Sequence, residues 1–458
     1  MSDQQPVEAE DLAAAVWPRT AHRGDQGQLV VGGVDTRKAV AEFGSPLFIL
    51  DREHFRESAE EFREAYDDEE LPGRVYYAGK AFLAGAVAQW AREAGLSLDV
   101  ATGGELEVAL LAGVPAADII FHGNNKSTQE IDRAIGAGVG RIVVDSFVEI
   151  ARVARAAQDH AVVADILVRV TVGVEAHTHA FVATAHEDQK FGLSLAGGDA
   201  MEAVRRVLRL DSLKLRGLHS HIGSQIFDSA GFEVAAHRMI TFVRQIRQDF
   251  DVDIEELNLG GGMGIAYTIA DDPLTVAEMA QQIRAIVRRE WQDDPGRPPR
   301  LAVEPGRAII GPAGITVYEV GTVKMVELDA GRRRAYVSVD GGMSDNIRTA
   351  LYDAEYTVTL ASRVSSAEPM LARVVGKHCE SGDIVVRDAW LPSDLGPGDL
   401  LAVAGTGAYC RSMASNYNML PRPAVVGAYR GDTEVVLRRE RLEDLLRLDP
   451  FVSGALQA

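Results

Sequence analysis

The apolar run VYYA (75–78) opens a series that continues with LSLDV (96–100), IIFHG (119–123), RIVVDS (141–146) and ADILVRV (164–170). Successive runs start 21 to 23 residues apart. A step of this length accommodates one strand, one crossover helix and two loops. The intervening AFLAGAVAQWAREAG also has the apolar spacing of a helix. Near-continuous apolar strands that alternate with helices predict a parallel sheet covered by helices.

Three further runs continue the series at longer steps, and they are LRGLHSHIG (215–223), ELNLGGG (256–262) and LAVEPG (301–306). Eight strand–helix units predict a closed (β/α)8 barrel, also called a TIM barrel. The longer steps indicate inserted loops. The segment between 171 and 214 has no clear place in the barrel pattern.

The chain on both sides of this series is rich in short β-branched segments. QLVVGGV and SPLFIL precede it, and runs such as ITVYEVGTVKMVEL and DIVVRDAWL follow after about residue 311. They predict antiparallel strands of a β-sandwich or small β-barrel. We therefore expect an α/β plus all-β chain with a tail over 1–27, strands over 28–50 that join the β domain, a (β/α)8 barrel over 51–310 and a C-terminal β domain over 311–458.

The composition excludes several classes of protein. The 458 residues include 67 acidic and 47 basic side chains, for a net charge of −20, and 47% are apolar. This apolar share excludes a disordered chain, and the negative charge disfavours a nucleic-acid partner. The chain has two cysteines, a polar start and no apolar run of the ~18 residues that cross a bilayer. These features predict a cytoplasmic protein without a membrane partner.

Polar residues follow the predicted strands at their carboxyl ends, where barrels of this kind place active sites. Lys80 follows the first strand. We expect its amine to be partly desolvated, which lowers its pKa and allows a Schiff base with an aldehyde, although a surface lysine fits the same pattern. Glu304, in EPGR, can keep a pyridine nitrogen protonated or form a structural salt bridge. Arg307 suits a phosphate or a carboxylate.

Glycines and histidines add further groups at the same ends. The run Gly260–Gly262 either presents backbone N–H groups to a phosphate, with Ser224 as a further donor, or makes a tight turn. His219 and His221 are two residues apart and face the same side of a strand. This spacing suits a metal, a flat cofactor stacked on one ring, or a core position. No acidic metal ligand is clearly placed, and we expect no metal.

Three motifs of the β domain carry candidate site residues. HCESGD (378–383) contains Cys379, a possible proton donor or a buried apolar thiol, and Glu380, which could bind an ammonium group. GAYCRSMASNYN (407–418) contains Tyr409, whose hydroxyl could reach a phosphate. DGGMSDNIRTALYDA (340–354) contains Arg348 and Tyr352, and Arg348 could clamp a carboxylate. Taken singly, each also suits an ordinary solvated position.

Together these motifs are specific. YAGKA, HSHIGSQ, LNLGGG, EPGR, CESGD and GAY, in this order, resemble the fold-type III pyridoxal phosphate decarboxylases. Their two-domain fold is like that of alanine racemase. GVEAHTHAFVATAHEDQKFGL (173–193) and RTALYDA are similar to the bacterial diaminopimelate branch rather than to ornithine or arginine decarboxylases. The resemblance covers about residues 28–440. One small departure is Gly79, where a bulkier residue is common.

The resemblance implies a role for each matching residue. Lys80 would hold pyridoxal 5′-phosphate through a Schiff base, and Cys379 would help to protonate the carbanion. The other cofactor-binding residues would be Asp99, Arg169, His221, Ser224, Gly261, Gly262, Glu304, Gly306, Arg307 and Tyr409. The substrate-binding residues would be Arg307, Arg348, Tyr352, Glu380 and Tyr409. In this family the positions resembling Cys379 and Glu380 reach the neighbouring subunit's site, which implies a homodimer with active sites at the interface.

The implied activity is that of a carboxy-lyase on a small amino-acid substrate. It would decarboxylate meso-2,6-diaminopimelate to L-lysine and CO2, the last step of lysine biosynthesis. Alternatives on the same fold are a decarboxylase of ornithine, lysine or arginine, or a racemase. A non-enzymatic homologue would be expected to lack Lys80 or Glu304, and both are present.

Overall fold

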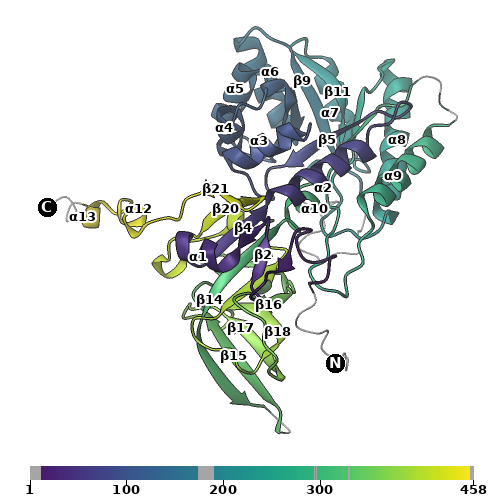
Figure 1. Ribbon diagram of the computed structural model, residues 1–458. Helices are drawn as coiled ribbons and strands as arrows, with labels where there is room; N and C mark the ends of the chain where they lie inside the picture. Colours follow the sequence, from purple (N-terminus) through teal and green to yellow (C-terminus); the bar gives the residue numbers. More distant parts are fainter. Residues whose placement is uncertain (1–11, 174–189, 293, 295–296, 329–330, 454–458) are drawn as a thin grey trace. The chain divides into compact units, whose positions relative to one another are not determined.

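The computed structural model describes residues 12–173, 190–292, 294, 297–328 and 331–453. The stretch 174–189, which contributes to the resemblance above, lies outside these residues, as do residues 1–11 of the expected tail. The chain divides into two compact units (Figure 1). The barrel unit comprises residues 56–264 and 272–309, and the sheet unit comprises residues 1–55, 265–271 and 310–458. Each unit is described by itself.

The barrel unit confirms the predicted (β/α)8 fold. Its eight parallel strands are β5 (Gly73–Ala78), β6 (Ser97–Val100), β7 (Ile119–Phe121), β8 (Arg141–Val144), β9 (Ala164–Thr171), β11 (Leu213–His219), β12 (Glu256–Asn258) and β13 (Arg300–Val303). The ring closes because β13 pairs with β5 in parallel register. In the segment that had no place in the pattern, the described part from residue 190 contains the short β10 (Leu193–Ser194), which pairs with β9, and a helix.

Among the described residues, seven helices follow the first seven strands of the barrel. They are α3 (Gly85–Glu93), α4 (Gly103–Leu111), α5 (Thr128–Ala137), α6 (Phe147–Asp159), α7 (Asp199–Leu208), α8 (Ala230–Phe250) and α9 (Val276–Trp291), with η1 (Ala116–Asp118) between α4 and β7. Four of these helices, α4, α5, α6 and α9, begin at a residue whose side chain caps the helix. Ser127 and Thr275 form capping boxes with the glutamates three residues on. Within the described ranges, no helix has the length and apolar character needed to span a bilayer.

The barrel interior is a packed core. Tyr76, Ile120, Val143, Leu167 and Ala302 come from five different strands and form one buried cluster. Filling of the interior by side chains leaves the strand ends as the place where polar groups can gather.

The sheet unit contains a nine-stranded sheet in which two neighbouring pairs are parallel. Its strands are β4 (Leu47–Asp51), β14 (Gly314–Glu327), β15 (Arg333–Val339), β16 (Val358–Leu360), β17 (Pro369–Val375), β18 (Ile384–Pro392), β19 (Leu400–Ala404), β20 (Ala424–Tyr429) and β21 (Asp432–Leu437). The expectation of antiparallel strands is wrong for β4 with β20 and for β15 with β17. The local residue pattern of a strand does not specify the direction of its neighbour.

The segment before β4 is mixed rather than a run of strands. β1 (His22–Arg23), β2 (Leu29–Val31) and β3 (Val34–Asp35) form a separate small sheet. The helix α1 (Thr36–Phe43) follows because the Asp35 carboxylate accepts the Arg37 N–H as an N-cap. The remaining helical elements are α2 (Arg52–Ala65), α10 (Arg307–Ile310), α11 (Arg348–Tyr352), η3 (Arg411–Met413), η4 (Tyr417–Met419), α12 (Leu442–Leu446) and α13 (Pro450–Ser453).

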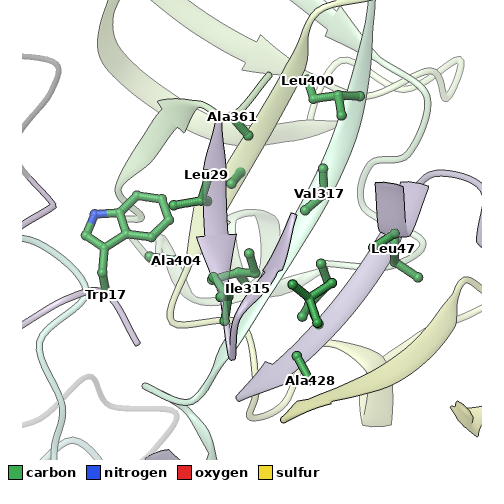
Figure 2. Packing of buried hydrophobic residues seen from close by; sticks show 14 of the residues in the cluster. Trp17, Leu29, Leu47, Ile315, Val317, Ala361, Leu400, Ala404 and Ala428 are labelled. Atoms are coloured by element: carbon green, nitrogen blue, oxygen red, sulfur yellow. The ribbon is translucent and has the colours of Figure 1, made fainter. Parts of the chain in front are cut away.

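Figure 2 shows the hydrophobic core of the sheet unit, in which Trp17 and Leu29 pack with Leu47, Ile315 and Val317. Leu29 is fully buried. We expect Leu29→Ala to lower the free energy of unfolding by about 2–5 kcal/mol, because it removes buried methyl groups and leaves a cavity. Leu448→Ala, at a side chain 82% exposed, should change it by less than ~0.5 kcal/mol. Urea unfolding measures both, and equal effects would contradict this core assignment.

His54, in the sheet unit, should make the folded protein less stable at acidic pH. Its buried ring accepts the Arg19 N–H at Nδ1 over 3.2 Å. Burial, with a contribution from the Arg19 charge, lowers the pKa of His54 to about 3. Below its ordinary pKa of ~6.5 the unfolded chain therefore binds a proton that the folded chain does not. As the pH falls from the pKa of the unfolded chain toward that of the folded chain, the free energy of unfolding should decrease by up to about 1.4 kcal/mol per pH unit. Urea unfolding at several pH values should show a shallower slope for His54→Gln, and identical slopes would refute the prediction.

Candidate active site

Buried polar side chains meet at the carboxyl ends of the barrel strands. Asp99 lies on β6, Arg169 on β9, His219 on β11 and Asn258 on β12, and Glu304 follows β13. All five are at most 9% exposed. Parallel strands in a closed barrel place these ends side by side. The structure therefore brings the predicted residues Asp99, Arg169 and Glu304 into one region.

Glu304 is the centre of this group. Asn258 Nδ2 donates to Glu304 Oε1 over 2.8 Å, and His219 Nε2 lies 3.2 Å from Oε2. His122 Nε2 lies 2.8 Å from Oε1. Burial alone would raise the pKa of Glu304, but the His122 and His219 interactions outweigh it and hold this pKa well below the usual range. The carboxylate is therefore ionised although it is buried.

Two imidazoles of the site, those of His219 and His221, have pKa values below the usual range. Burial lowers the pKa of His219 to about 4. It also lowers the pKa of His221 well below the usual value, with help from the Lys80 and Arg169 charges. A neutral ring suits contact with a flat aromatic group. The metal alternative considered from the sequence combined His219 with His221. In the structure His219 instead lies near His122 and Glu304, and one potential ligand atom of each of these three residues lies within 4.8 Å of the others.

Lys80 lies two residues after the end of β5 and is exposed. The sequence predicted partial desolvation of this amine, and the exposure of the side chain runs against that prediction. Burial raises the pKa of Asp99, and the charge of Lys80 is one of those that oppose this rise. The position of Lys80 after β5 puts it at the same ends of the barrel strands as the buried cluster.

The glycine run has a packing reason of its own. A Cβ on Gly261 would lie 2.1 Å from the Glu304 carbonyl oxygen, and one on Gly262 would lie 2.3 Å from that of Gly223. The tight-turn alternative thus accounts for these glycines, and phosphate binding stays a prediction. Next to the Gly223 loop, Arg307 Nη2 donates to Ser224 Oγ over 2.9 Å. A guanidinium and a hydroxyl, both predicted to bind phosphate, are therefore paired.

The sequence reasoning missed a buried ion pair beneath this site. Lys126 Nζ lies 2.5 Å from Glu149 Oε1 and also donates to the carbonyl oxygens of Gly123 and Val143. Glu149 in turn accepts the Asp145 N–H over 2.7 Å. The signal available in the sequence was a lysine in HGNNKS, five residues after the end of the apolar strand β7. The pair links the ends of β7 and β8.

This ion pair yields a stability prediction. Removing one partner leaves a buried charge uncompensated, so Lys126→Met or Glu149→Gln should each cost about 3–5 kcal/mol. The double variant should cost less than the sum of the two. Asp159→Asn, at the exposed pair that Arg155 and Asp159 form along α6, should cost under ~0.5 kcal/mol. Urea unfolding of the variants checks this, and additive costs at the buried pair would contradict it.

The sheet unit carries the remaining predicted residues. Arg348 is 5% exposed, and its Nη1 donates to Tyr267 Oη over 2.7 Å and to Tyr356 Oη over 2.6 Å. The two tyrosines were not identified from the sequence, since neither stands in a recognised motif. Tyr352 and Tyr409 are half-buried. Cys379 and Glu380 are exposed in the loop between β17 and β18, so the buried interpretation of Cys379 is wrong, whereas Cys410 is buried.

The barrel residues fit pyridoxal phosphate by their chemistry. An ionised buried carboxylate can accept a hydrogen bond from a pyridinium nitrogen, and a neutral imidazole can pack on the ring. Arg307 with Ser224 offers a guanidinium and a hydroxyl to a phosphate. Lys80 supplies an amine for an aldehyde. The donor set thus covers the ring nitrogen, the aldehyde and the phosphate of this cofactor.

Comparison with known proteins confirms the resemblance. Residues 52–311 match the pyridoxal-binding domain of the pyridoxal-dependent decarboxylases. The chain is 56% identical over 442 residues to the diaminopimelate decarboxylase of Mycobacterium tuberculosis (strain ATCC 25618 / H37Rv). This alignment covers 96% of this chain and 98% of that protein. It is 44% identical over 439 residues to that of Bacillus subtilis (strain 168), with 96% and 99% covered. The crystal structure of M. jannaschii diaminopimelate decarboxylase with L-lysine matches with a TM-score of 0.87 and 31% identity, covering 94% and 98% of the two chains. This chain belongs to the diaminopimelate decarboxylase family of pyridoxal-dependent decarboxylases.

Proposed function

We propose that this protein is a pyridoxal 5′-phosphate-dependent enzyme that decarboxylates meso-2,6-diaminopimelate to L-lysine and CO2. The observation that carries the proposal is the buried Glu304 carboxylate, which Asn258, His219 and His122 hold at the mouth of a barrel whose first strand leads to Lys80. The names of the relatives indicate the substrate, and the L-lysine in the M. jannaschii structure is the expected product.

The barrel residues would bind and orient the cofactor. When bound, pyridoxal phosphate supplies an electron sink for the electron pair released as CO2 leaves. Glu304 accepts the hydrogen of the ring nitrogen, and its histidine and asparagine neighbours keep it ionised for this role. Lys80 holds the aldehyde carbon, and the neutral His221 packs on the ring face. Ser224, Gly261, Gly262 and Arg307 hold the phosphate, while Asp99 and Arg169 support the lysine and the ring.

Residues of the sheet unit would recognise the far end of the substrate and move a proton. Arg348 Nε is buried without a hydrogen-bond partner among the described residues, so this guanidinium has capacity for a carboxylate beyond its two tyrosines. Tyr352 and Tyr409 add hydroxyl groups on the sheet unit, Glu380 binds the distal ammonium, and Cys379 delivers a proton to the Cα carbon. Arg307 is the candidate for a substrate carboxylate on the barrel unit. In this proposal Cys379 and Glu380 act in a homodimer, and the two free thiols suit the cytoplasm.

Lys80→Ala tests the cofactor role. The purified variant should lose the visible absorption band of the bound cofactor and release no CO2, because no other amine takes the place of Lys80. Lys214→Ala, at an exposed lysine on β11, should keep both signals. A pigmented and active Lys80→Ala protein would refute the assignment.

The substrate assignment is tested on the unaltered enzyme by CO2 release from meso-diaminopimelate, lysine, ornithine and arginine. Preference for meso-diaminopimelate is expected, because a substrate without the second carboxylate leaves buried arginine groups unpaired. A preference for lysine, ornithine or arginine would replace this substrate with the alternative.

A further inference from the structure

Two loops of the sheet unit leave the sheet at the same edge. β15 and β17 are neighbours in parallel register, with Ser338 opposite Val375. The loop 340–347 follows β15 and leads to Arg348, and the loop 376–383 follows β17 and contains Cys379 and Glu380. The parallel pairing therefore brings together two motifs that are separate in the sequence.

Asp383 joins these loops through its side chain. Its Oδ1 accepts the Met343 N–H over 2.6 Å, and its Oδ2 accepts the His378 N–H over 2.8 Å. The residue is 3% exposed. One carboxylate thus holds a backbone amide of the loop before Arg348 and a backbone amide next to Cys379. Hydrogen bonds to an ionised acceptor are among the stronger ones in proteins.

The two loops leave room for this carboxylate by means of glycines. A Cβ on Gly376 would lie 2.2 Å from Asp383 Oδ2, and a Cβ on Gly342 would lie 2.5 Å from Oδ1. Each loop contributes one of these glycines, so any side chain there would push the carboxylate from its amides. The geometry of the contact is therefore built from both loops and not from Asp383 alone.

The third motif of the sheet unit meets the same structure. His378 Nδ1 lies 3.0 Å from Asn418 Oδ1, and the Ser415 N–H donates to the Ser344 carbonyl over 2.8 Å. The segment 407–418, which contains Tyr409, is therefore attached to both loops. Asp383 lies where the three predicted recognition motifs are connected.

We propose that Asp383 is a positioning residue for substrate recognition, which holds the loop carrying Cys379 and Glu380 against the segment carrying Arg348. This inference rests on the proposed function, because those residues recognise the substrate there. Asp383 itself is buried and acts through the loops. Its loss should affect the far end of the substrate more than the cofactor, whose predicted binding residues lie in the barrel unit except for Tyr409.

The test compares the Asp383→Asn holoenzyme with Asp388→Asn, the same change at an exposed position of β18. An amide group cannot accept from both backbone amides without turning its NH2 toward one of them. For Asp383→Asn we expect the visible absorption band of the cofactor to be unchanged. Alanine, which lacks the distal end of the substrate, should shift this band at the same half-maximal concentration as in the unaltered enzyme. KM for meso-diaminopimelate should rise about tenfold or more, the factor expected for one lost hydrogen bond to a charged group. Asp388→Asn should match the unaltered enzyme.

A second readout needs no turnover. Cys410 is buried, so a water-soluble aromatic disulfide reagent reports on the exposed Cys379. Its reaction rate should rise severalfold in Asp383→Asn, because the loop is released. Gly376→Ala, which displaces the carboxylate without removing it, should raise KM and the thiol rate in the same way.

The outcomes separate the two proposals. If the unaltered enzyme releases no CO2 from meso-diaminopimelate, the proposed function fails, and the thiol rates alone decide the role of Asp383. A merely structural role would lower the yield of folded holoenzyme while leaving KM and the Cys379 rate of the folded fraction unchanged. That result in Asp383→Asn, or in Gly376→Ala if the former does not fold, would overturn the inference.

Discussion

A negative charge enclosed by the barrel mouth is the constraint on which the site depends. A buried carboxylate is unfavourable unless it is paired and hydrogen-bonded. Glu304 is stabilised by His122 after β7, His219 on β11 and Asn258 on β12. These residues come from three separate strand ends, so the charge can be held only when the barrel is closed. The fold and the chemistry are therefore coupled. Only the closed ring of strands brings together the partners that hold the Glu304 carboxylate in place for a pyridine nitrogen.

The same principle recurs at two other places in the chain. Lys126 and Glu149 connect the ends of β7 and β8 beneath the mouth. Asp383 connects two loops of the sheet unit. In each case a buried charge is matched by partners from neighbouring segments, and backbone groups that have no partner in a strand are satisfied at the same time. Polar groups are buried in this protein where loops must be held in one position.

The sequence predicted those features that have a local or periodic signal. The 21-to-23-residue spacing revealed the barrel, and the motifs around Lys80, Glu304 and Arg348 marked residues that the structure places at strand ends or in buried clusters. Asn258 was missed although it lies in LNLGGG, because that motif was interpreted only through its glycines. The tyrosines that hold Arg348 are brought to it only by folding, as is Glu149 to Lys126. The solvent exposure of Lys80 depends on how far its side chain extends past β5, which spacing does not reveal.

The placement of β4 has a consequence for how the protein is made. β4 (Leu47–Asp51) is wholly buried, between β14 on one side and β20 on the other. On the ribosome its apolar residues emerge early, but β20 is not synthesised until residue 429. The barrel, whose last strand ends at Val303, can close first. Until the final third of the chain appears, β4 is an uncovered aggregation-prone strand, and nascent chains should be most dependent on chaperones during that interval.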